Sequence, residues 1–301
     1  MTRWTALGDW GGTRLRLWQR QAEGITARAD GRGVLALDRA PLCELRDCLA
    51  AWIAQAGNPE RIVLCGMAGS ELGLRSIAHA DCPLDATEWA AHAATLTVDG
   101  LAIRIAAGCV GRQPGNGQED VMRGEETQIF GALRLRPELA EGARAFVLPG
   151  THSKWVTTSM GAITGLRSFM SGELFDLLQA SSLFTRAGEP SDEGTHEGFA
   201  AGLAEARQGV SLAGGLFHTR VAQLREQRSR GWAAGYLSGL IIGSEVGEMA
   251  PLLPPGGVTI IGGARLAARY QRALDGCGVA AMALDGDDCA LAGLEVLDEF
   301  A

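Results

Sequence analysis

The chain has 301 residues, with 27 basic and 35 acidic side chains and a formal net charge of −8. A chain of this charge lacks the clustered basic surface that binding along a phosphate backbone requires, which excludes extended contact with nucleic acid. Its length exceeds the usual size of one hydrophobic core and predicts two lobes with a ligand site in their shared cleft.

The amino terminus and the cysteines point to one compartment. The first ten residues lack the apolar core of a signal peptide, and no apolar run is long enough to cross a bilayer. The seven cysteines are odd in number and include no Cys-x-x-Cys pair, which argues against a disulfide framework and a structural zinc site. We therefore expect a cytoplasmic protein with reduced thiols and no membrane partner.

The first motif is a strand, a glycine turn and a second strand in the segment GDWGGTRLRLW. Gly11 and Gly12 let main-chain N–H groups approach an anion, and Thr13 and Arg16 supply further donors. Asp9, at the end of the first strand, is a candidate ligand for Mg²⁺. The motif predicts a phosphate-binding hairpin. An ordinary turn with solvated arginines, begun by Asp9, is the alternative.

The next segment predicts a helix that leads into a buried strand. Apolar residues recur at helical spacing from Leu42 to Ile53, and Gly57 ends the helix. The strand RIVLCG then opens into the loop GMAGS, in the position where open α/β sheets bind ligands. Residues 101–108 alternate like a strand, residues 110–124 are expected to form a polar loop, and GEETQIFGALRL is predicted to be a helix.

A second strand, turn and strand follow in AFVLPGTHSKWVTT, where Gly150 and Thr151 precede Lys154 as Gly12 and Thr13 precede Arg16. Because this strand, turn and strand motif occurs twice, phosphate binding is favoured over two ordinary turns. We expect an N-terminal lobe over residues 1–140 and a C-terminal lobe over residues 141–301.

The C-terminal part is predicted to be mainly helical from residue 172 to residue 251. A buried strand, a Gly-Gly turn and an amphipathic helix follow between Val258 and Leu274. A last helix lies in DDCALAGLEVLDEF and is expected to pack back at the hinge between the lobes.

In their order and spacing, these segments resemble the 2-dehydro-3-deoxygalactonokinase family of the sugar-kinase, Hsp70 and actin superfamily over nearly the whole chain. The fragments that carry the resemblance are GDWGGTRLRLW, GMAGS, VMRGEETQIFGAL, LPGTHSKWV, FMSGELFDLL, YLSGLIIGSEV and IIGGARLAARYQRAL. The resemblance implies a two-lobed α/β fold of the actin-like ATPase type, a duplicated ribonuclease H-like fold. It also implies ATP-dependent phosphorylation of 2-dehydro-3-deoxy-D-galactonate at its terminal hydroxyl, in galactonate breakdown.

A hydroxyl acceptor needs a base or an orienting carboxylate. Glu125 and Glu126 are the candidates, because they open a helix directly before the second hairpin, where the superfamily often carries an aspartate. In the alternative reading, the two glutamates only complement the helix dipole. Glu173 is a third candidate, and helix capping explains it equally well.

The substrate implied by the resemblance is an anionic keto acid, whose carboxylate needs an arginine fork. Arg123 is the first candidate and Arg167 the second, and a solvated surface arginine is the alternative for each. The loop after the buried strand is expected to line the sugar pocket, with Met67, Ala68, Gly69 and Ser70.

The superfamily places adenosine at the Gly-Gly turn, which here is Gly262, Gly263 and Ala264. Gly239 is expected to allow close helix packing. A kinase for the gluconate epimer or another sugar acid, and a nucleotide-binding regulator of the same fold, are the alternative functions. The chain could form a homodimer, although no residue pattern reports its oligomeric state.

Overall fold

The computed structural model describes residues 3–181 and 192–300. The chain divides into two compact units, each of which draws on segments far apart in the sequence. The first unit comprises Met1–Arg144, Val156–Arg167 and Leu284–Ala301, and the second comprises Ala145–Trp155 and Ser168–Ala283. The lobe boundary expected at residue 141 stays a prediction.

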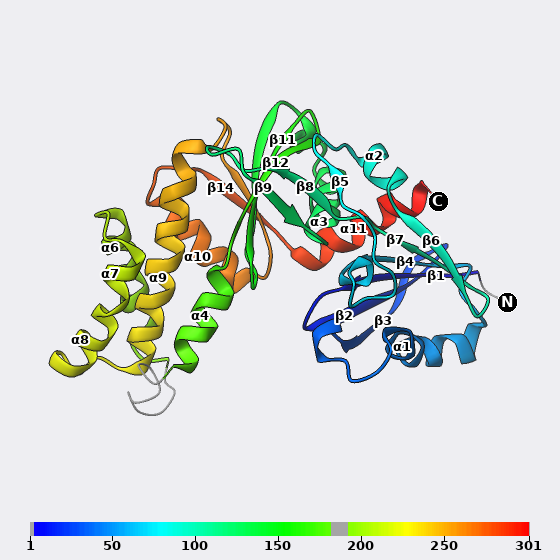
Figure 1. The fold of residues 1–301 in the computed structure, drawn as a ribbon, viewed down its shortest axis with the longest axis horizontal. Helices are drawn as coiled ribbons and strands as arrows, with labels where there is room; N and C mark the ends of the chain where they lie inside the picture. The colour runs from blue at the N-terminus through cyan, green and yellow to red at the C-terminus, as the bar shows by residue number, and fades with distance from the viewer. Residues whose placement is uncertain (1–2, 182–191, 301) are drawn as a thin grey trace. The chain divides into compact units, whose positions relative to one another are not determined.

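A six-stranded sheet forms the centre of the first unit, in the order β3-β2-β1-β4-β7-β6 (Figure 1). Its strands are β1 (Thr5–Trp10), β2 (Arg14–Gln21), β3 (Gly24–Arg32), β4 (Arg61–Gly66), β6 (Ala94–Val98) and β7 (Leu101–Ile105). β1 pairs with β4 in parallel and with β2 in antiparallel orientation. The predicted first hairpin is therefore confirmed as β1 and β2, and the buried strand RIVLCG as β4.

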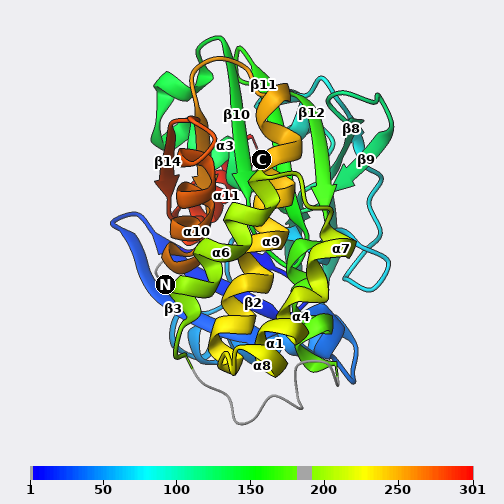
Figure 2. The same cartoon turned by 90° about the vertical axis from the view of Figure 1, so that its left-hand side faces the viewer.

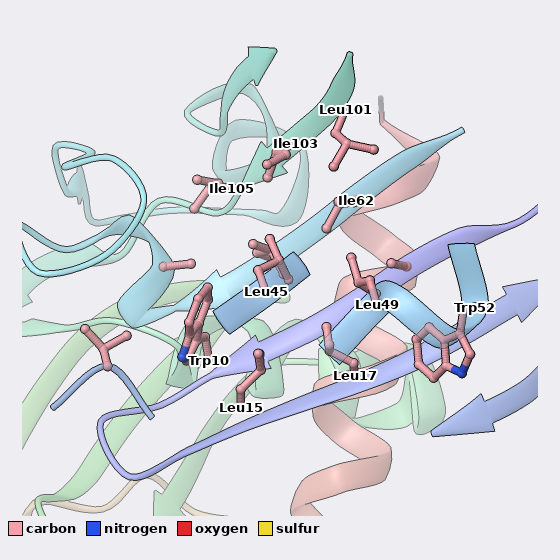
Figure 3. Packing of buried hydrophobic residues seen from close by; sticks show 14 of the residues in the cluster. Trp10, Leu15, Leu17, Leu45, Leu49, Trp52, Ile62, Leu101, Ile103 and Ile105 are labelled. Carbon is pink, nitrogen blue, oxygen red and sulfur yellow. The ribbon is translucent and has the colours of Figure 1, made fainter. Parts of the chain in front are cut away.

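Alternation along β2 separates its two faces, as expected for a period of two. Leu15 and Leu17 are fully buried, whereas Arg14 is exposed. The leucines join a core that Leu45 and Leu49 of helix α1 (Pro41–Ala56) complete, as Figure 3 shows. This burial fixes which face of the hairpin carries its arginines.

The last helix belongs to the first unit. α11 (Gly286–Glu299) packs on α3 (Glu125–Leu135) and reaches β1 and β4. The two helices approach through glycines, since a Cβ on Gly131 would lie 1.8 Å from the Cys289 carbonyl oxygen and one on Gly293 would lie 1.9 Å from the Thr127 oxygen. α11 is thereby brought next to the strand that carries Asp9.

The expectation of a loop over residues 110–124 is wrong. The segment contains β8 (Cys109–Arg112) and β9 (Glu119–Met122), which pair in antiparallel orientation and form a three-stranded sheet with β5 (Ala80–Asp81). Polar, glycine-rich composition suggested a loop, whereas the pairing of β8 with β9, and of β8 with β5, stabilises strands there. α2 (Ala86–Ala91), which the sequence did not suggest, precedes β6.

A five-stranded sheet has the order β12-β11-β10-β13-β14, and β10 and β13 run in parallel. Its strands are β10 (Ala143–Leu148), β11 (Ser153–Ser159), β12 (Ala162–Phe169), β13 (Val258–Ile261) and β14 (Ala281–Leu284). The predicted second hairpin is confirmed as β10 and β11, and the late strand as β13.

The helices of the second unit include a closely packed pair, α6 and α9, which lie side by side in Figures 1 and 2. The helices are α4 (Ser171–Ala180), α6 (Thr195–Arg207), α7 (Leu212–Leu216), α8 (His218–Arg225), α9 (Arg230–Met249) and α10 (Ala264–Asp275). Short 3-10 helices lie at Val34–Ala36, Met67–Gly69, Pro137–Ala140 and Ala250–Leu252. The predicted helical region is confirmed, except that residues 182–191 lie outside the described residues.

Within the part of the chain that the structure describes, no helix combines the length and the apolar character that crossing a membrane requires.

Glycines in α9 let its backbone approach α6. A Cβ on Gly239 would lie 2.2 Å from the Phe199 carbonyl oxygen, whereas one on Gly247 of the same helix would meet no atom within 4 Å. We expect Gly239→Ala to lower the free energy of unfolding by about 1–3 kcal/mol. Gly247→Ala is the matched control and should leave stability unchanged or raise it by up to about 1 kcal/mol. Urea denaturation with equal midpoints for the two variants would contradict this packing.

Candidate active site

The carboxyl ends of β1 and β4 lie side by side, because their parallel register aligns Asp9 with Cys65 and Trp10 with Gly66. Gly66 has a φ of +71°, and a Cβ there would lie 2.7 Å from the Trp10 oxygen. Gly124, which precedes α3, lies close to Gly66: a Cβ added to Gly124 would lie 3.2 Å from Gly66 Cα. Three elements of the first unit therefore converge on Asp9, where α/β sheets bind ligands.

An arginine links two carboxylates at this point. Arg16 faces Asp9 across the β1–β2 pair, and its guanidinium donates to Asp9 Oδ2 and to Asp287 Oδ1 at the start of α11. Burial lowers the pKa of Arg16, but the two carboxylates outweigh burial and raise it. The predicted phosphate ligand Arg16 is thus held in place by two acidic side chains.

Asp287 is a site residue that the sequence did not reveal. Arg28 also donates to it, at 2.7 Å, and Arg14 lies 3.7 Å away. Partial burial raises the pKa of Asp287, but Arg16 and Arg28 reverse this and hold it below its ordinary value. An aspartate in the first turn of a helix usually complements the helix dipole, and no spacing connected this one to Arg16.

The turn of the first hairpin is held by main-chain hydrogen bonds. Gly11 N donates to Arg14 O, at 2.9 Å, and the carbonyl oxygens of Gly11 and Gly12 accept from Val34 and Leu35, at 3.1 and 3.0 Å. Thr13 is exposed at the tip. These bonds leave the side chain of Thr13 on the surface next to the turn.

Glu125 and Glu126 both reach back over the start of α3, but their surroundings differ. Glu126 is fully buried, and both of its carboxylate oxygens accept from Gly124 N, at 2.8 Å. Burial, and then the negative charge of Glu125, raise the pKa of Glu126 to about 8. Glu125 is partly exposed and accepts from Arg123 N at 3.1 Å.

Arg123 lies against the loop that follows β4. A Cβ on Gly69 would lie 2.9 Å from Arg123 Nη1. Arg123 Nη2 donates to Ile77 O at 2.7 Å and lies 3.3 Å from His79 Nε2. Nη1 is buried and has no hydrogen-bond partner among the described residues. The structure thus brings together Gly69 and Arg123, two of the predicted substrate residues.

The rest of the predicted sugar pocket lies in or next to the 3-10 helix Met67–Gly69. Met67 is partly exposed, Ala68 is buried, and Ser70 Oγ donates to Met67 O at 2.8 Å. Arg167 lies on β12 and is half-buried.

The second hairpin meets the start of α4. A Cβ on Gly172 would lie 2.2 Å from the Gly150 oxygen, and Glu173 N donates to Thr151 O at 2.9 Å. His152 Nε2 lies 2.7 Å from Glu173 Oε2, so the third base candidate is paired with a histidine of the hairpin. Gly150 and Thr151 are exposed, as an anion-binding turn requires.

Lys154 and the Gly-Gly turn lie in the same unit as this hairpin. Lys154 is largely buried, and its Nζ donates to Ser168 Oγ at 2.6 Å. A Cβ on Gly262 would lie 3.7 Å from Pro149 Cδ, because β10 and β13 are parallel neighbours and end at the same edge. Gly263 and Ala264 are exposed where α10 begins.

A pocket of about 260 Å³ opens beside the second hairpin, within the second unit. Its floor includes the buried residues Ser238, Ile241 and Tyr270, and Arg269 Nη1 donates to Ser238 Oγ at 3.0 Å. The full lining is Gly150, Thr151, Ser171, Gly172, Phe175, Asp176, Ser238, Ile241, Ile242, Arg265, Leu266, Arg269 and Tyr270. The lining combines apolar side chains such as Ile241 and Leu266 with charged ones such as Asp176 and Arg265, a mixture that suits a heterocyclic ring with polar edges.

In the first unit, Asp9 is the candidate carboxylate for a metal ion, and within the described part of the chain it is not part of a cluster of several protein ligands. Among the described residues, no group of three or more His, Cys, Asp or Glu side chains could hold an ion. Asp9 lies at the end of β1, and its Oδ2 accepts a hydrogen bond from Arg16. Such a donor set fits Mg²⁺, which binds through one or two carboxylates and completes its shell with phosphate and water.

The fold and these paired glycine turns define an α/β protein of the sugar-kinase and actin-like ATPase type. Two solved structures of lower similarity share the fold, with TM-scores of 0.53 and 0.52 at 12% and 13% identity. They are the component A of an Acidaminococcus fermentans 2-hydroxyglutaryl-CoA dehydratase and a Clostridium difficile dehydratase activator with bound ADPNP.

The chain belongs to the 2-keto-3-deoxy-galactonokinase family, whose model matches residues 9–297. It is 33% identical, over 95% of its length and 94% of the relative's, to the 2-dehydro-3-deoxygalactonokinase of Escherichia coli K12. With equal coverage it is 34% identical to a Rhizobium meliloti (strain 1021) protein described as a probable 2-dehydro-3-deoxygalactonokinase.

A crystal structure of a Sinorhizobium meliloti protein, provisionally described as a 2-dehydro-3-deoxygalactonokinase, has a TM-score of 0.84 and 29% identity. The superposition covers 98% of both chains. The family expected from the sequence fragments is therefore confirmed, and so is the fold.

The buried carboxyl group of Glu126 predicts a pH-dependent stability. Between an unfolded pKa of about 4.5 and a folded pKa of about 8, the folded chain holds a proton that the unfolded chain releases. The free energy of unfolding should therefore fall as pH rises through this window, by about 3–5 kcal/mol in total.

Glu126→Gln should remove this slope, because the amide copies the protonated carboxyl group and does not titrate. Glu119→Gln changes an exposed carboxylate and serves as the control. Denaturant titrations from about pH 5 to about pH 8.5 measure the effect. Parallel pH profiles for the wild type and Glu126→Gln would show that Glu126 is not the titrating group.

Proposed function

We propose that the chain transfers the terminal phosphoryl group of ATP to the terminal hydroxyl of 2-dehydro-3-deoxy-D-galactonate, giving the 6-phosphate, as a step of galactonate breakdown in the cytoplasm. Membership of the family and the names of its relatives support this activity. The observation on the molecule that supports it best is the buried, unpartnered Nη1 of Arg123 beside the Gly69 loop.

A buried donor without a partner is costly, and a ligand that accepts its hydrogen bond removes the cost. Arg123 is anchored at Nη2 by Ile77 O, so Nη1 remains for the ligand. A carboxylate accepts a charge-assisted hydrogen bond there, which favours a sugar acid over a neutral sugar. Gly69 supports this arrangement, because a side chain at that position would lie 2.9 Å from Nη1.

Glu125 or Glu126 would accept the proton of the attacking hydroxyl, while the hydroxyl oxygen forms its bond to phosphorus and the bond to ADP breaks. The two carboxyl groups differ in their ability to accept this proton at neutral pH and in their access to substrate. Glu126, with a pKa of about 8, carries its proton at neutral pH and becomes a base only at alkaline pH. Glu125 is partly exposed and is the residue of the pair that solvent and substrate can reach.

The nucleotide would bind to the second unit. Its base would enter the pocket floored by Ser238, and Gly262, Gly263 and Ala264 would lie along the adenosine. Gly150 and Thr151 would offer N–H and hydroxyl donors to phosphate, and Lys154 would add positive charge. The exposure of the hairpin and its place on the pocket wall support this assignment.

In the first unit, Gly11, Gly12, Thr13 and Arg16 would contact phosphate, with Arg16 steadied by Asp287. Asp9 would contribute a carboxylate oxygen to Mg²⁺, which when bound neutralises phosphate charge. Met67, Ala68, Gly69 and Ser70 would contact the sugar, and Arg167 is a second candidate for its carboxylate. A homodimer stays a prediction.

A coupled ADP-release assay tests the function. We expect turnover to require both Mg²⁺ and a 2-keto-3-deoxy sugar acid, and NMR of the product to place the phosphate on the terminal carbon. ADP release at the same rate without an acceptor would contradict a sugar-acid kinase and favour the regulator. Comparing kcat/KM for the galactonate and gluconate epimers tests the stereochemical assignment, and a higher value for the gluconate epimer would overturn it.

Arg123→Lys tests recognition of the carboxylate. Lysine keeps the charge but loses the fork that reaches both Ile77 O and the ligand, so KM for the sugar acid should rise roughly 10- to 100-fold. KM for ATP should stay within about twofold. Arg112→Lys, at an exposed surface arginine, is the control.

A substrate analogue makes this test specific to the carboxylate. With the amide of the sugar acid in place of the acid, wild type and Arg123→Lys should react with similar efficiency, because the charge that Arg123 recognises is gone. An equal loss with acid and amide would mean that Arg123 does not bind the carboxylate.

A further inference from the structure

A buried carboxyl group lies near the C-terminal end of α9, in the second unit. Glu245 is 3% exposed, and four neutral side chains donate hydrogen bonds to it. Ser153 Oγ and Trp155 Nε1 donate to Oε1 at 2.5 and 2.6 Å, and Tyr270 OH lies 3.0 Å from both oxygens. Ser171 Oγ donates to Oε2.

This arrangement uses the full accepting capacity of a carboxylate. An ionised carboxylate has about four acceptor positions, and the indole N–H of Trp155 can only donate. Burial raises the pKa of Glu245 above its ordinary value, and the four donors reduce that rise without reversing it. A buried glutamate is expensive unless its hydrogen bonds are made, and a buried network whose hydrogen bonds are made holds its members rigidly.

The four donors belong to three elements, β11, α4 and α10, of which α4 and α10 line the pocket. Ser153 follows the turn of the second hairpin and directly precedes Lys154. Ser171 begins α4 next to Gly172, against which the Gly150 carbonyl packs. Tyr270 projects from α10. Glu245 is not part of the pocket lining, whereas Ser171 and Tyr270 are.

We propose that Glu245 is a positioning residue for the nucleotide: its carboxylate fixes Ser153, Ser171 and Tyr270, so that the second hairpin and two walls of the pocket are set before the nucleotide binds. This inference rests on the proposed binding of ATP in the second unit. Preorganisation of this kind strengthens binding, because less ordering is needed when the ligand arrives. The sugar acid, whose proposed ligands are in the first unit, should be unaffected.

Glu245→Gln and Glu245→Leu test the role in two steps. Glutamine can keep Oε1 toward Ser153 and Trp155 and turn its NH₂ group toward Ser171, whose hydroxyl can accept. We expect KM for ATP, and the ADP Kd from calorimetry, to rise about threefold to tenfold in Glu245→Gln, the effect of about one hydrogen bond. Glu245→Leu, which loses all four, should raise both further, while KM for the sugar acid stays within about twofold in each variant.

Glu205→Gln is the matched control, because Glu205 also accepts a tyrosine hydroxyl in the second unit, from Tyr236 at 2.6 Å, but lies outside the pocket. The control should leave both KM values unchanged. The indole N–H resonance of Trp155, assigned with Trp155→Phe, reports the hydrogen bond to Glu245 directly and should move in Glu245→Gln. Ser171→Ala removes one donor and should also raise KM for ATP if Glu245→Leu fails to fold.

The outcomes separate this inference from the proposed function. If wild type makes ADP with the sugar acid, and Glu245→Gln shifts the Trp155 resonance with no change in the ADP Kd or KM for ATP, the positioning role is overturned and the kinase assignment stands. If KM for ATP and KM for the sugar acid rise equally, Glu245 supports the fold in general and the inference is wrong. If wild type binds no ADP, both proposals fail.

Discussion

The parallel pairing of β1 with β4 brings together the proposed ligands of the first unit. Its register aligns Asp9 with Cys65, and so the end of β1 meets the turn at Gly66 and the start of α3 beyond Gly124. Parallel strands end at the same edge of a sheet, which gathers loops from distant segments at one place. β10 and β13 do the same in the second unit, where the hairpin at Gly150 meets the turn at Gly262.

At the edge of the first sheet where β1 and β4 end, the charge of Arg16 is balanced by nearby carboxylates. Arg16 donates to both Asp9 and Asp287, and these two carboxylates orient the guanidinium. An oriented charge stabilises a phosphoryl group without reorganising during the reaction. Asp287 lies on α11, and the close contact of Gly131 and Gly293 with the facing helix backbones holds α11 there. Helix packing in this way sets the geometry of a charged site.

Two of the buried glutamates, Glu126 and Glu245, have different hydrogen-bond partners. Glu126 accepts from Gly124 N and, at 3.4 Å, from Thr127 Oγ1, has the charge of Glu125 nearby, and has a pKa raised to about 8. Glu245 accepts from four side chains that can all donate, and its pKa is also raised by burial. Burial raises the pKa of both groups, and they differ in where their donors lie: those of Glu245 come from three separate elements, whereas Gly124 and Thr127 lie at the start of the helix that carries Glu126.

The periodicity and the glycine positions of the sequence were enough to predict both hairpins, helix α1 and the strand that carries Gly66. They also predicted the strand, turn and helix around Gly262. These are local features, because alternation, helical spacing and turn residues act over a few positions. The order of the fragments also determined the family. The pair β8 and β9 was mistaken for a loop, because strand pairing supplies what its polar composition lacks.

Only the tertiary structure decided which residues meet. Arg16 and Asp287 are 271 positions apart, and the partners of Glu245 come from β11, α4 and α10. Arg123 could be proposed as a carboxylate ligand from its chemistry, but its unpartnered nitrogen beside Gly69 appears only once β4 and α3 are brought together. Such contacts depend on strand register and helix packing between distant segments, and a residue carries no local signal of a partner that chain folding selects.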